Sequence, residues 1–360
     1  MKFFVTGVGG QLGHDVMNEL ISRGHEGVGS DIQAQYSGIQ DGTPVATAPY
    51  RQLDITDAKA VTSVITEVNP DAVIHCAAWT AVDAAEDEEN IPKVRAINAG
   101  GTQYIANAVK ALNALRAGET PPQAGAGTSP DGEKPLRLPS AGTSLDRGKP
   151  LRPASQGTSP NRGGSCKMTY ISTDYVFNGR GTTPWEPDCK DYAPLNVYGQ
   201  TKLEGELAVS STLDKYFIVR IAWVFGLNGK NFIKTMLNVG KKYDTVRVVN
   251  DQIGTPTYTY DLAKLLVDMN ESEAYGYYHA TNEGGYISWY DFTKEIYRQA
   301  GYETEVVPVT TEEYGLSKAA RPFNSRLEKK KLVECGFEPL PAWQDALERY
   351  LKALKENGDL

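Results

Sequence analysis

The sequence predicts an α/β protein with a doubly wound parallel sheet, a smaller C-terminal lobe and a low-complexity insert. Short β-branched runs alternate with amphipathic stretches, a pattern typical of parallel strands covered by helices. The alternation loosens after about residue 222, where aromatic residues become frequent. We therefore expect residues 1–222 to form the sheet domain and residues 223–360 to form mainly a substrate-binding lobe, with some segments returning to the first domain.

Five strands and four helices are expected to alternate along the first domain. Each predicted strand is a short run rich in Val, Ile, Phe or Tyr, and each predicted helix carries apolar residues at helical spacing. The predicted strands are 3–6, 26–30, 71–76, 168–172 and 217–221, and the predicted helices are 12–23, 57–68, 92–115 and 196–211. Because parallel strands need a crossover between them, this order indicates a Rossmann-type sheet.

The insert covers residues 116–166, between the third predicted helix and the fourth predicted strand. It contains 9 Gly and 8 Pro, lacks aromatic residues, and repeats Gly-Thr-Ser every 15 residues, at Gly127, Gly142 and Gly157. So few apolar side chains cannot offset the entropy lost on ordering the segment. We expect a disordered surface loop that interrupts the sheet domain between its third helix and fourth strand.

Charge and cysteine content exclude several classes of protein. The insert carries 7 Lys or Arg against 4 Asp or Glu, a charge of +3. The whole chain has a net charge of −8, so the residues outside the insert carry −11. Such an acidic body does not suit nucleic-acid binding. The N-terminus lacks a signal-peptide core, and no apolar run approaches the ~18 residues of a membrane span. Four cysteines without CxxC spacing and four scattered histidines predict a cytoplasmic protein with reduced thiols, no metal site and no membrane partner.

A glycine-rich turn follows the first predicted strand directly. Gly7, Gly10 and Gly13 form Gly-x-x-Gly-x-x-Gly at the start of the first helix. Glycines at such a turn let the backbone approach a pyrophosphate, and the helix N-terminus offers free N–H groups to it. The strand-turn-helix position therefore predicts a dinucleotide site.

Two carboxylates are candidates for the adenosine end of that site. Asp31 ends the second strand, 18 residues past Gly13, where a carboxylate accepts hydrogen bonds from ribose hydroxyls. This favours NADH slightly, but Arg51 could offset the charge for NADPH, so both cofactors stay open. Asp54, with Ile55, could hold the adenine edge, or Asp54 could be the N-cap of the helix from Asp57.

Tyr198 and Lys202 are separated by four residues and share one face of a predicted helix. A neighbouring ammonium favours a phenolate and should lower the phenol pKa towards neutrality. The sequence has four Tyr-x-x-x-Lys pairs, which begin at Tyr198, Tyr260, Tyr290 and Tyr314. Only the first follows the strand that carries Thr173, whose hydroxyl would hydrogen-bond a substrate oxygen at the carboxyl edge of the sheet.

Six ordered motifs outside the insert carry a resemblance to a known family. They are Thr6-Gly7-x-x-Gly10-Gln11-Leu12-Gly13, Cys76-Ala77-Ala78-Trp79-Thr80-Ala81-Val82-Asp83, Ser172-Thr173-Asp174-Tyr175-Val176-Phe177, Tyr198-Gly199-x-Thr201-Lys202-Leu203-x-Gly205-Glu206, Arg220-Ile221-Ala222-Trp223-Val224-Phe225-Gly226 and Asn250-Asp251-Gln252-x-Gly254-Thr255-Pro256-Thr257. The chain resembles the extended short-chain dehydrogenase/reductase superfamily and, within it, the dTDP-4-dehydrorhamnose reductases. The insert is foreign to that pattern. At the positions of Cys76 and Trp79, relatives commonly have other residues.

The resemblance implies NAD(P)H-dependent reduction of dTDP-4-dehydro-β-L-rhamnose at C4, giving dTDP-β-L-rhamnose for cell-surface polysaccharide. Tyr198 would donate the proton, Lys202 would bind the nicotinamide ribose, and Thr173 would polarise the keto oxygen. The cofactor would contact Gly7, Gly10, Gln11, Leu12, Gly13, Asp31, Asp54, Ile55, Ala77, Ala78, Trp79, Thr80, Tyr198 and Lys202. The dTDP-sugar would contact Thr173, Asp174 and Trp223.

Several alternatives stay open at this point. A relative of these reductases serves as a noncatalytic regulatory subunit of methionine adenosyltransferase, and others are nucleotide-sugar epimerases. A related dehydratase family has a glutamate at the position of Tyr175, so dehydration is disfavoured. Trp223 could pack within the lobe instead of contacting substrate, and Arg321 either meets a diphosphate or lies on a solvated face. The sequence also leaves open whether the protein forms a homodimer.

Overall fold

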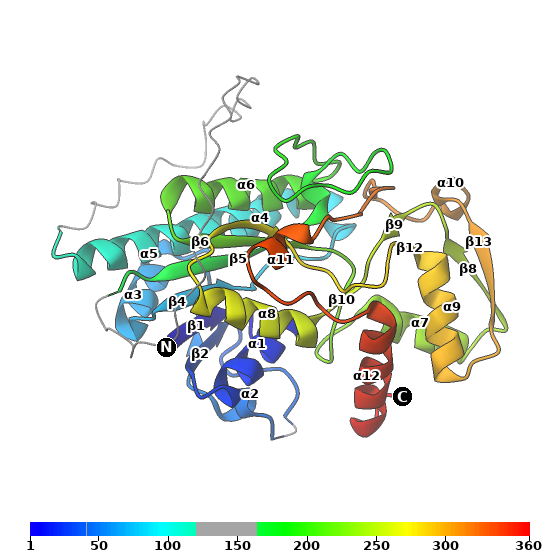
Figure 1. The fold of residues 1–360 in the computed structure, drawn as a ribbon, viewed down its shortest axis with the longest axis horizontal. Helices are drawn as coiled ribbons and strands as arrows, with labels where there is room; N and C mark the ends of the chain where they lie inside the picture. The colour runs from blue at the N-terminus through cyan, green and yellow to red at the C-terminus, as the bar shows by residue number, and fades with distance from the viewer. Residues whose placement is uncertain (41, 120–163) are drawn as a thin grey trace.

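The computed structural model describes residues 1–40, 42–119 and 164–360, and its centre is a seven-stranded parallel sheet (Figure 1). The strand order is β11-β6-β5-β4-β1-β2-β3, and every neighbouring pair is parallel. The strands are β1 (Lys2–Thr6), β2 (Glu26–Asp31), β3 (Tyr50–Gln52), β4 (Ala72–His75), β5 (Lys167–Thr173), β6 (Tyr216–Ile221) and β11 (Gly276–His279). The order reverses between β1 and β4, and this switch point opens a crevice at the carboxyl ends of the strands.

Helices cover both faces of the sheet, which confirms the doubly wound fold (Figure 1). α1 (Gln11–Ser22) and α8 (Thr259–Glu271) pack together on one face, and α3 (Ala58–Val68), α5 (Thr102–Arg116) and α6 (Val197–Thr212) lie on the other. The sheet is buried between two apolar layers, one on each face. All five predicted strands form, and β3 and β11 join them at the two edges.

The single helix predicted at 92–115 is divided in the structure. α4 (Ile91–Arg95) runs into a π-helical turn (Ala96–Gly101), and α5 follows. The side chain of Asn98 in this turn accepts a hydrogen bond from the backbone N–H of Trp79 at 2.8 Å and donates to the Thr201 hydroxyl at 3.1 Å. The wider turn therefore joins the loop after β4 to helix α6.

The C-terminal part of the chain builds a second lobe around an aromatic core. The lobe contains three two-stranded pairings and four helices, at the right of Figure 1. Its elements are β7 (Val224–Phe225), α7 (Phe232–Gly240), β8 (Thr245–Val249), β9 (Ile253–Gly254), β10 (Thr257–Tyr258), β12 (Ile287–Ser288), α9 (Trp289–Ala300), β13 (Glu305–Val309), α10 (Thr311–Tyr314) and α12 (Trp343–Glu356). The chain leaves this lobe for α8, which packs on the sheet, and for β11, which joins it at the edge. α11 (Lys330–Glu334) packs against β11. The short α2 (Pro44–Thr47) packs on α1.

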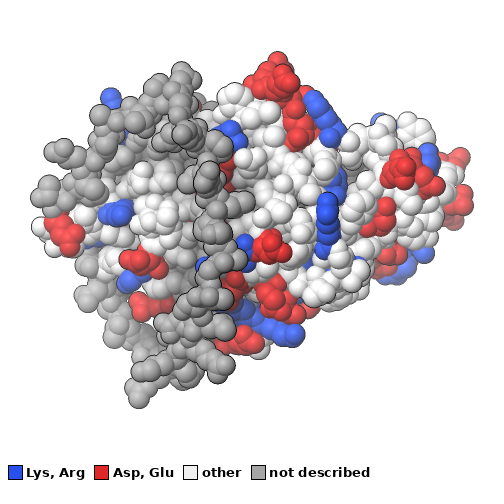
Figure 2. Space-filling model, turned by 90° about the horizontal axis from the view of Figure 1, so that it is seen from above, with Lys and Arg blue, Asp and Glu red and all other residues white. Residues whose placement is uncertain are grey.

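The insert connects α5 to β5, at the position that the flanking sequence predicts. Disorder was expected for all of 116–166, but Arg116 still belongs to α5 and Cys166 is buried, so the ends of the predicted range are ordered. Residues 120–163 lie outside the described residues. Within the described ranges, no helix is long and apolar enough to cross a membrane, and no group of three His, Cys, Asp or Glu side chains is placed to hold a metal ion. The four cysteines are free thiols, and Figure 2 shows acidic and basic side chains interspersed over one face of the molecule.

Candidate functional site

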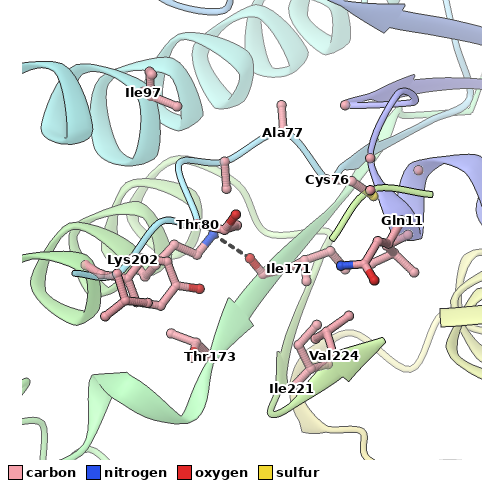
Figure 3. Close-up of a pocket in the computed structure, with 18 of the residues that line it drawn as sticks. Gln11, Cys76, Ala77, Thr80, Ile97, Ile171, Thr173, Lys202, Ile221 and Val224 are labelled. Atoms are coloured by element: carbon pink, nitrogen blue, oxygen red, sulfur yellow. Dashed lines mark hydrogen bonds between the residues drawn. The ribbon is translucent and has the colours of Figure 1, made fainter. Parts of the chain in front are cut away.

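A cavity of about 900 Å³ lies between the carboxyl ends of the strands and the second lobe (Figure 3). One end is formed by the glycine turn and the ends of β1 and β2, and the other end by β5, α6 and aromatic side chains of the second lobe. Pockets of this size accommodate most small ligands and cofactors. Residues far apart in the sequence therefore share one concave site, at the switch point of the sheet.

The glycine turn leaves no room for side chains at two of its three glycines. Gly7 has φ +72°, and a Cβ on Gly13 would lie 2.3 Å from the Gly7 carbonyl oxygen. Helix α1 starts after Gly10 without a side-chain cap and without an acidic residue in its first turn. Its first backbone N–H groups have no intrahelical partner and lie at the cavity, which suits a phosphate group.

We expect Gly13→Ala to weaken both folding and cofactor binding. The added Cβ must push α1 away from β1, because the contacting atoms are backbone atoms of Gly7 and Val8. Overpacking of this kind costs about 1–3 kcal/mol of unfolding free energy. A shift of α1 also moves its N–H groups, so we expect NADPH to bind at least about tenfold more weakly, equivalent to ~1.4 kcal/mol.

The control for this variant is Gly100→Ala, in the π-helical turn. A Cβ on Gly100 would meet the Arg95 carbonyl oxygen only at 3.9 Å, an ordinary van der Waals distance. Chemical unfolding followed by circular dichroism, and NADPH titration followed by fluorescence, measure the two effects. Equal stability and equal NADPH affinity of the two variants would refute the role assigned to the close approach of Gly13 and Gly7.

Asp31 and Asp54 line the cavity beyond the glycine turn, at the end expected for adenosine. The Asp31 carboxylate accepts hydrogen bonds from the backbone N–H of Gly9 at 3.0 Å and of Ile32 at 2.8 Å. The interpretation of Asp54 as the N-cap of α3 is wrong, because Asp57 caps that helix through the N–H groups of its first turn. Asp54 instead accepts from the N–H and hydroxyl of Thr56, and Ile55 lines the cavity beside it.

Arg51 does not join this end of the site. Its guanidinium pairs with Glu67 at 2.8 Å on the exposed surface, and the residue does not line the cavity. The proposed compensation of the Asp31 charge by Arg51 is therefore absent among the described contacts.

The loop after β4 supplies one wall of the cavity, with one exception among the predicted residues. Ala77, Ala78 and Thr80 line the cavity, whereas Trp79 does not. The Trp79 indole N–H donates to the Ala81 carbonyl oxygen at 3.0 Å, and the Lys93 ammonium lies 5.6 Å from the ring centroid. These contacts hold the indole outside the cavity lining, and a contact between Trp79 and the cofactor stays a prediction.

Lys202 lies on α6 with its ammonium buried against the sheet (Figure 3). Asn196 caps this helix by accepting a hydrogen bond from the Gly199 N–H at 2.8 Å. The Lys202 Nζ donates to the Ile171 carbonyl oxygen at 2.7 Å and lies 4.1 Å from the ring centroid of Tyr170. Burial lowers the pKa of Lys202 to about 7, although the nearby Glu206 carboxylate acts to raise it.

Tyr198 lines the cavity one helical turn before Lys202, beside Thr173 at the end of β5. The expected lowering of the Tyr198 pKa is wrong for this structure. Burial raises the pKa of the phenol, the Asp174 charge raises it further, and the Thr173 hydrogen bond offsets only part of this. Tyr198 is therefore a neutral phenol at pH 7, the form that can donate a proton.

Asp174 and Trp223 also line the cavity, as the resemblance implied. The Thr173 hydroxyl donates to the Asp174 carboxylate at 3.0 Å, and burial raises the pKa of Asp174 to about 6. Trp223 has φ +50° and stacks on Trp289 with ring centroids 3.7 Å apart. The two interpretations of Trp223 are thus compatible, because one side of the indole packs in the lobe while the residue faces the cavity.

The other three Tyr-x-x-x-Lys pairs lie away from the cavity. Tyr260 and Tyr290 lie on α8 and α9 with their lysines over their own rings, and α10 ends at Tyr314. None of these tyrosines lines the cavity. The choice of Tyr198 from its place after β5 agrees with this geometry.

Several lining residues were missed because no motif spacing marks them. The aromatic-rich composition after residue 222 was the available signal, and it did not say which rings face the site. Residues that line the cavity but were outside the predicted set include Lys93, Ile97, Asn228, Lys230, Phe232, Trp289 and Phe292.

The fold and the site together define a dinucleotide-dependent oxidoreductase of the extended short-chain dehydrogenase/reductase type. A glycine turn at the switch point and a Tyr-x-x-x-Lys pair with Thr173 line opposite ends of one cavity. The chain belongs to the RmlD substrate binding domain family, which matches residues 1–115 and 162–356. The unmatched stretch falls within the insert.

Sequence and structure comparisons agree with this assignment. The chain is 32% identical over 351 residues to the spore coat polysaccharide biosynthesis protein SpsK of Bacillus subtilis, covering 98% of this chain and 97% of that protein. It is also 32% identical over 359 residues to a dTDP-4-dehydrorhamnose reductase of Streptomyces griseus, covering 98% and 94%.

Two solved structures show the same fold over nearly their whole length. A dTDP-4-dehydrorhamnose reductase of Clostridium acetobutylicum matches with a TM-score of 0.76 and 33% identity, covering 99% of this chain and 100% of that one. The Bacillus anthracis dTDP-4-dehydrorhamnose reductase, solved in complex with NADP, matches with a TM-score of 0.74 and 32% identity, covering 98% and 100%.

Proposed function

We propose that this protein catalyses the NAD(P)H-dependent reduction of dTDP-4-dehydro-β-L-rhamnose at C4 to dTDP-β-L-rhamnose. The observation that carries the proposal is that Thr173, Tyr198 and Lys202 line the same cavity as the glycine turn. Relatives with more than 30% identity over almost the whole chain are named for this reaction. We assign the cofactor mainly to residues 1–222 and the sugar mainly to residues 223–360.

The residues at the glycine turn fit a dinucleotide. A Cβ at Gly7 or Gly13 would fill the space beside the backbone, so the sequence keeps a cradle open there. The uncapped N-terminus of α1 offers N–H groups to a pyrophosphate, and Asp31 and Asp54 offer carboxylates to the adenosine. When bound, the nicotinamide supplies a hydride. We propose that either NADH or NADPH serves.

At the other end of the cavity, the chain's own residues manage the proton. Tyr198 is neutral at pH 7, so its hydroxyl can protonate the oxygen on C4 as negative charge develops there. The Thr173 hydroxyl donates to Asp174 in this structure, and by turning its single O–H to the same oxygen it would stabilise the developing charge. Lys202, held by the Ile171 carbonyl, would contact the nicotinamide ribose and keep the cofactor in line with C4.

Substrate contacts and cellular location follow from the same proposal. Asp174 and Trp223 would contact the dTDP-sugar, since both line the cavity beside Thr173. We place the protein in the cytoplasm, where NAD(P)H is available and where four free thiols persist.

The test is NAD(P)H oxidation by the purified protein with a panel of nucleotide 4-keto sugars. We expect the highest kcat/KM with dTDP-4-dehydro-β-L-rhamnose, and dTDP-β-L-rhamnose as the product identified by nuclear magnetic resonance. A protein that binds NADPH but oxidises it with no member of the panel would contradict the proposal and support a noncatalytic subunit. Tightly retained NAD after purification would indicate an epimerase instead.

A further inference from the structure

The hydroxyl of Ser30, near the carboxyl end of β2, is buried without a hydrogen-bond partner among the described residues. Ser30 is only 1% exposed, and it lines the cavity at the end formed by the glycine turn and the ends of β1 and β2. A buried hydroxyl without a partner costs free energy, because its bonds to water in the unfolded chain are not replaced. The folded chain therefore holds an unsatisfied polar group at the cavity, which a ligand can satisfy.

The strands on either side of β2 do not supply the missing bond. On β1, Thr6 lies beside Ser30 in the register, but its hydroxyl is already engaged. It lies 2.7 Å from Nδ1 of His75 and accepts a hydrogen bond from the backbone N–H of Ala77 at 3.2 Å. On β3, the residue beside Ser30 is Arg51, whose guanidinium is held in a surface ion pair.

The surroundings of the Ser30 hydroxyl are apolar. Val28 lies two residues earlier on the same face of β2 and is buried in the apolar layer between the sheet and helices α3 and α5. Ser30 therefore faces the part of the cavity where this layer reaches the ends of the strands, which we call the apolar slot. The apolar residues that line it are Leu53, Ile55, Ala77 and Ile97.

Asp54 provides a second polar group beside the apolar slot. The backbone N–H of Leu53 donates to the Asp31 carbonyl oxygen at 2.9 Å, which keeps residues 53 and 54 next to the end of β2. Both hydrogen bonds from Thr56 to the Asp54 carboxylate use one oxygen, Oδ1. The cavity therefore combines apolar walls with a hydroxyl that can donate and a carboxylate that can accept. A flat ring with a ring nitrogen and an amino group fits this combination.

We propose that the Ser30 hydroxyl donates a hydrogen bond to a ring nitrogen of the cofactor's adenine base. This inference rests on the proposed function, because it takes NADH or NADPH as the ligand, and it adds a contact inside the sheet edge to the groups at the glycine turn. The ligand-free protein carries the cost of the unsatisfied hydroxyl, and the bound adenine removes that cost. The hydroxyl thus contributes to cofactor affinity without stabilising the ligand-free fold.

The test measures ligand binding and stability of Ser30→Ala separately. We expect NADPH, NADH and ADP-ribose to bind about 3- to 10-fold more weakly than to the wild type, because one neutral hydrogen bond is lost. Reduced nicotinamide mononucleotide, which lacks the adenine, should bind equally to both proteins. In urea, the ligand-free variant should unfold at the same midpoint as the wild type or at a higher one, since the substitution removes an unsatisfied polar group. Fluorescence titration follows the reduced nucleotides, and calorimetry follows ADP-ribose.

Two further variants serve as controls. Ser30→Cys fills the same space with a weak donor, so it should also bind the dinucleotides more weakly than the wild type. Wild-type NADPH affinity in Ser30→Cys would show that packing alone matters, and would overturn the inference. Ser22→Ala removes an exposed hydroxyl that donates to the Glu19 carbonyl oxygen at the end of α1, and it should bind NADPH like the wild type.

The remaining outcomes separate this inference from the proposed reaction. Equal NADPH affinity of Ser30→Ala and the wild type would overturn it, and so would a lower unfolding midpoint of the ligand-free variant, since the hydroxyl would then serve the fold. If Ser30→Ala and the wild type bind 2′-deoxy-ADP-ribose equally, the bond goes to the ribose and the adenine assignment fails. If Ser30→Ala loses affinity as expected but the wild type reduces none of the 4-keto sugars, the proposed reaction fails and the adenine contact stands.

Discussion

Replacing Tyr198 with phenylalanine is expected to lower kcat by about 10²–10⁴-fold, the usual contribution of a positioned general acid. The substitution removes one hydroxyl from a half-buried ring and leaves its packing against Tyr175 in place. Without that hydroxyl, the oxygen on C4 loses the group assigned to give it a proton. NADPH affinity should stay near the wild-type value, because the glycine turn and Lys202 are unchanged.

The measurement is single-turnover NADPH oxidation with the keto sugar, together with NADPH titration. Tyr290→Phe is the matched control, since Tyr290 also precedes a lysine by four residues on a helix but lies outside the cavity. We expect the control to turn over like the wild type. An unchanged rate in Tyr198→Phe would show that another group supplies the proton, and the assignment would have to be abandoned.

Glu206→Gln is expected to lower the unfolding free energy by about 3–5 kcal/mol, because it strands a buried charge. Glu206 on α6 and Arg220 on β6 are both fully buried, and their side chains form two bonds of 2.8 and 2.7 Å. The Arg220 guanidinium also lies about 5 Å from the ring centroids of Phe177 and Tyr277, away from water. Glutamine keeps the shape of the side chain but cannot neutralise the guanidinium.

The chain offers a control for this variant on the same helix. Glu204 pairs with Arg95 at 3.1 Å on the surface, so Glu204→Gln should change stability by no more than about 1 kcal/mol. Urea unfolding followed by circular dichroism compares the two. If Glu206→Gln does not fold, the double variant Glu206→Gln with Arg220→Met should recover folded protein, because it removes both charges. Equal stability of Glu206→Gln and Glu204→Gln would refute the argument.

Much of the sheet was predictable because its inner strands are buried on both faces. β1, β4, β5 and β6 read as short apolar runs bounded by helices, and that local pattern is sufficient. β3 was missed because two of its three residues are exposed and it carries no apolar run. β11 was missed because it pairs with β6 only after the chain has passed through the second lobe.

The lining of the cavity was easiest to predict where residues lie at or directly after the end of a strand. Gly7, Asp31 and Thr173 occupy such positions, and parallel strands bring their carboxyl ends to one edge. Trp79 lies outside the cavity lining, which its spacing could not predict, because a side chain in a loop can turn either way and its contacts with Ala81 and Lys93 depend on the folded loop.

The amino-acid sequence is enough to establish the doubly wound fold, the glycine turn, the Tyr198–Lys202 pair and the family, because these depend on local spacing and on the order of motifs. The pKa of Tyr198, the stacking of Trp223 on Trp289 and the approach of Arg321 to Tyr175 needed the folded chain. Burial and contacts between distant segments depend on how the lobe closes over the sheet, and spacing along the chain does not record that.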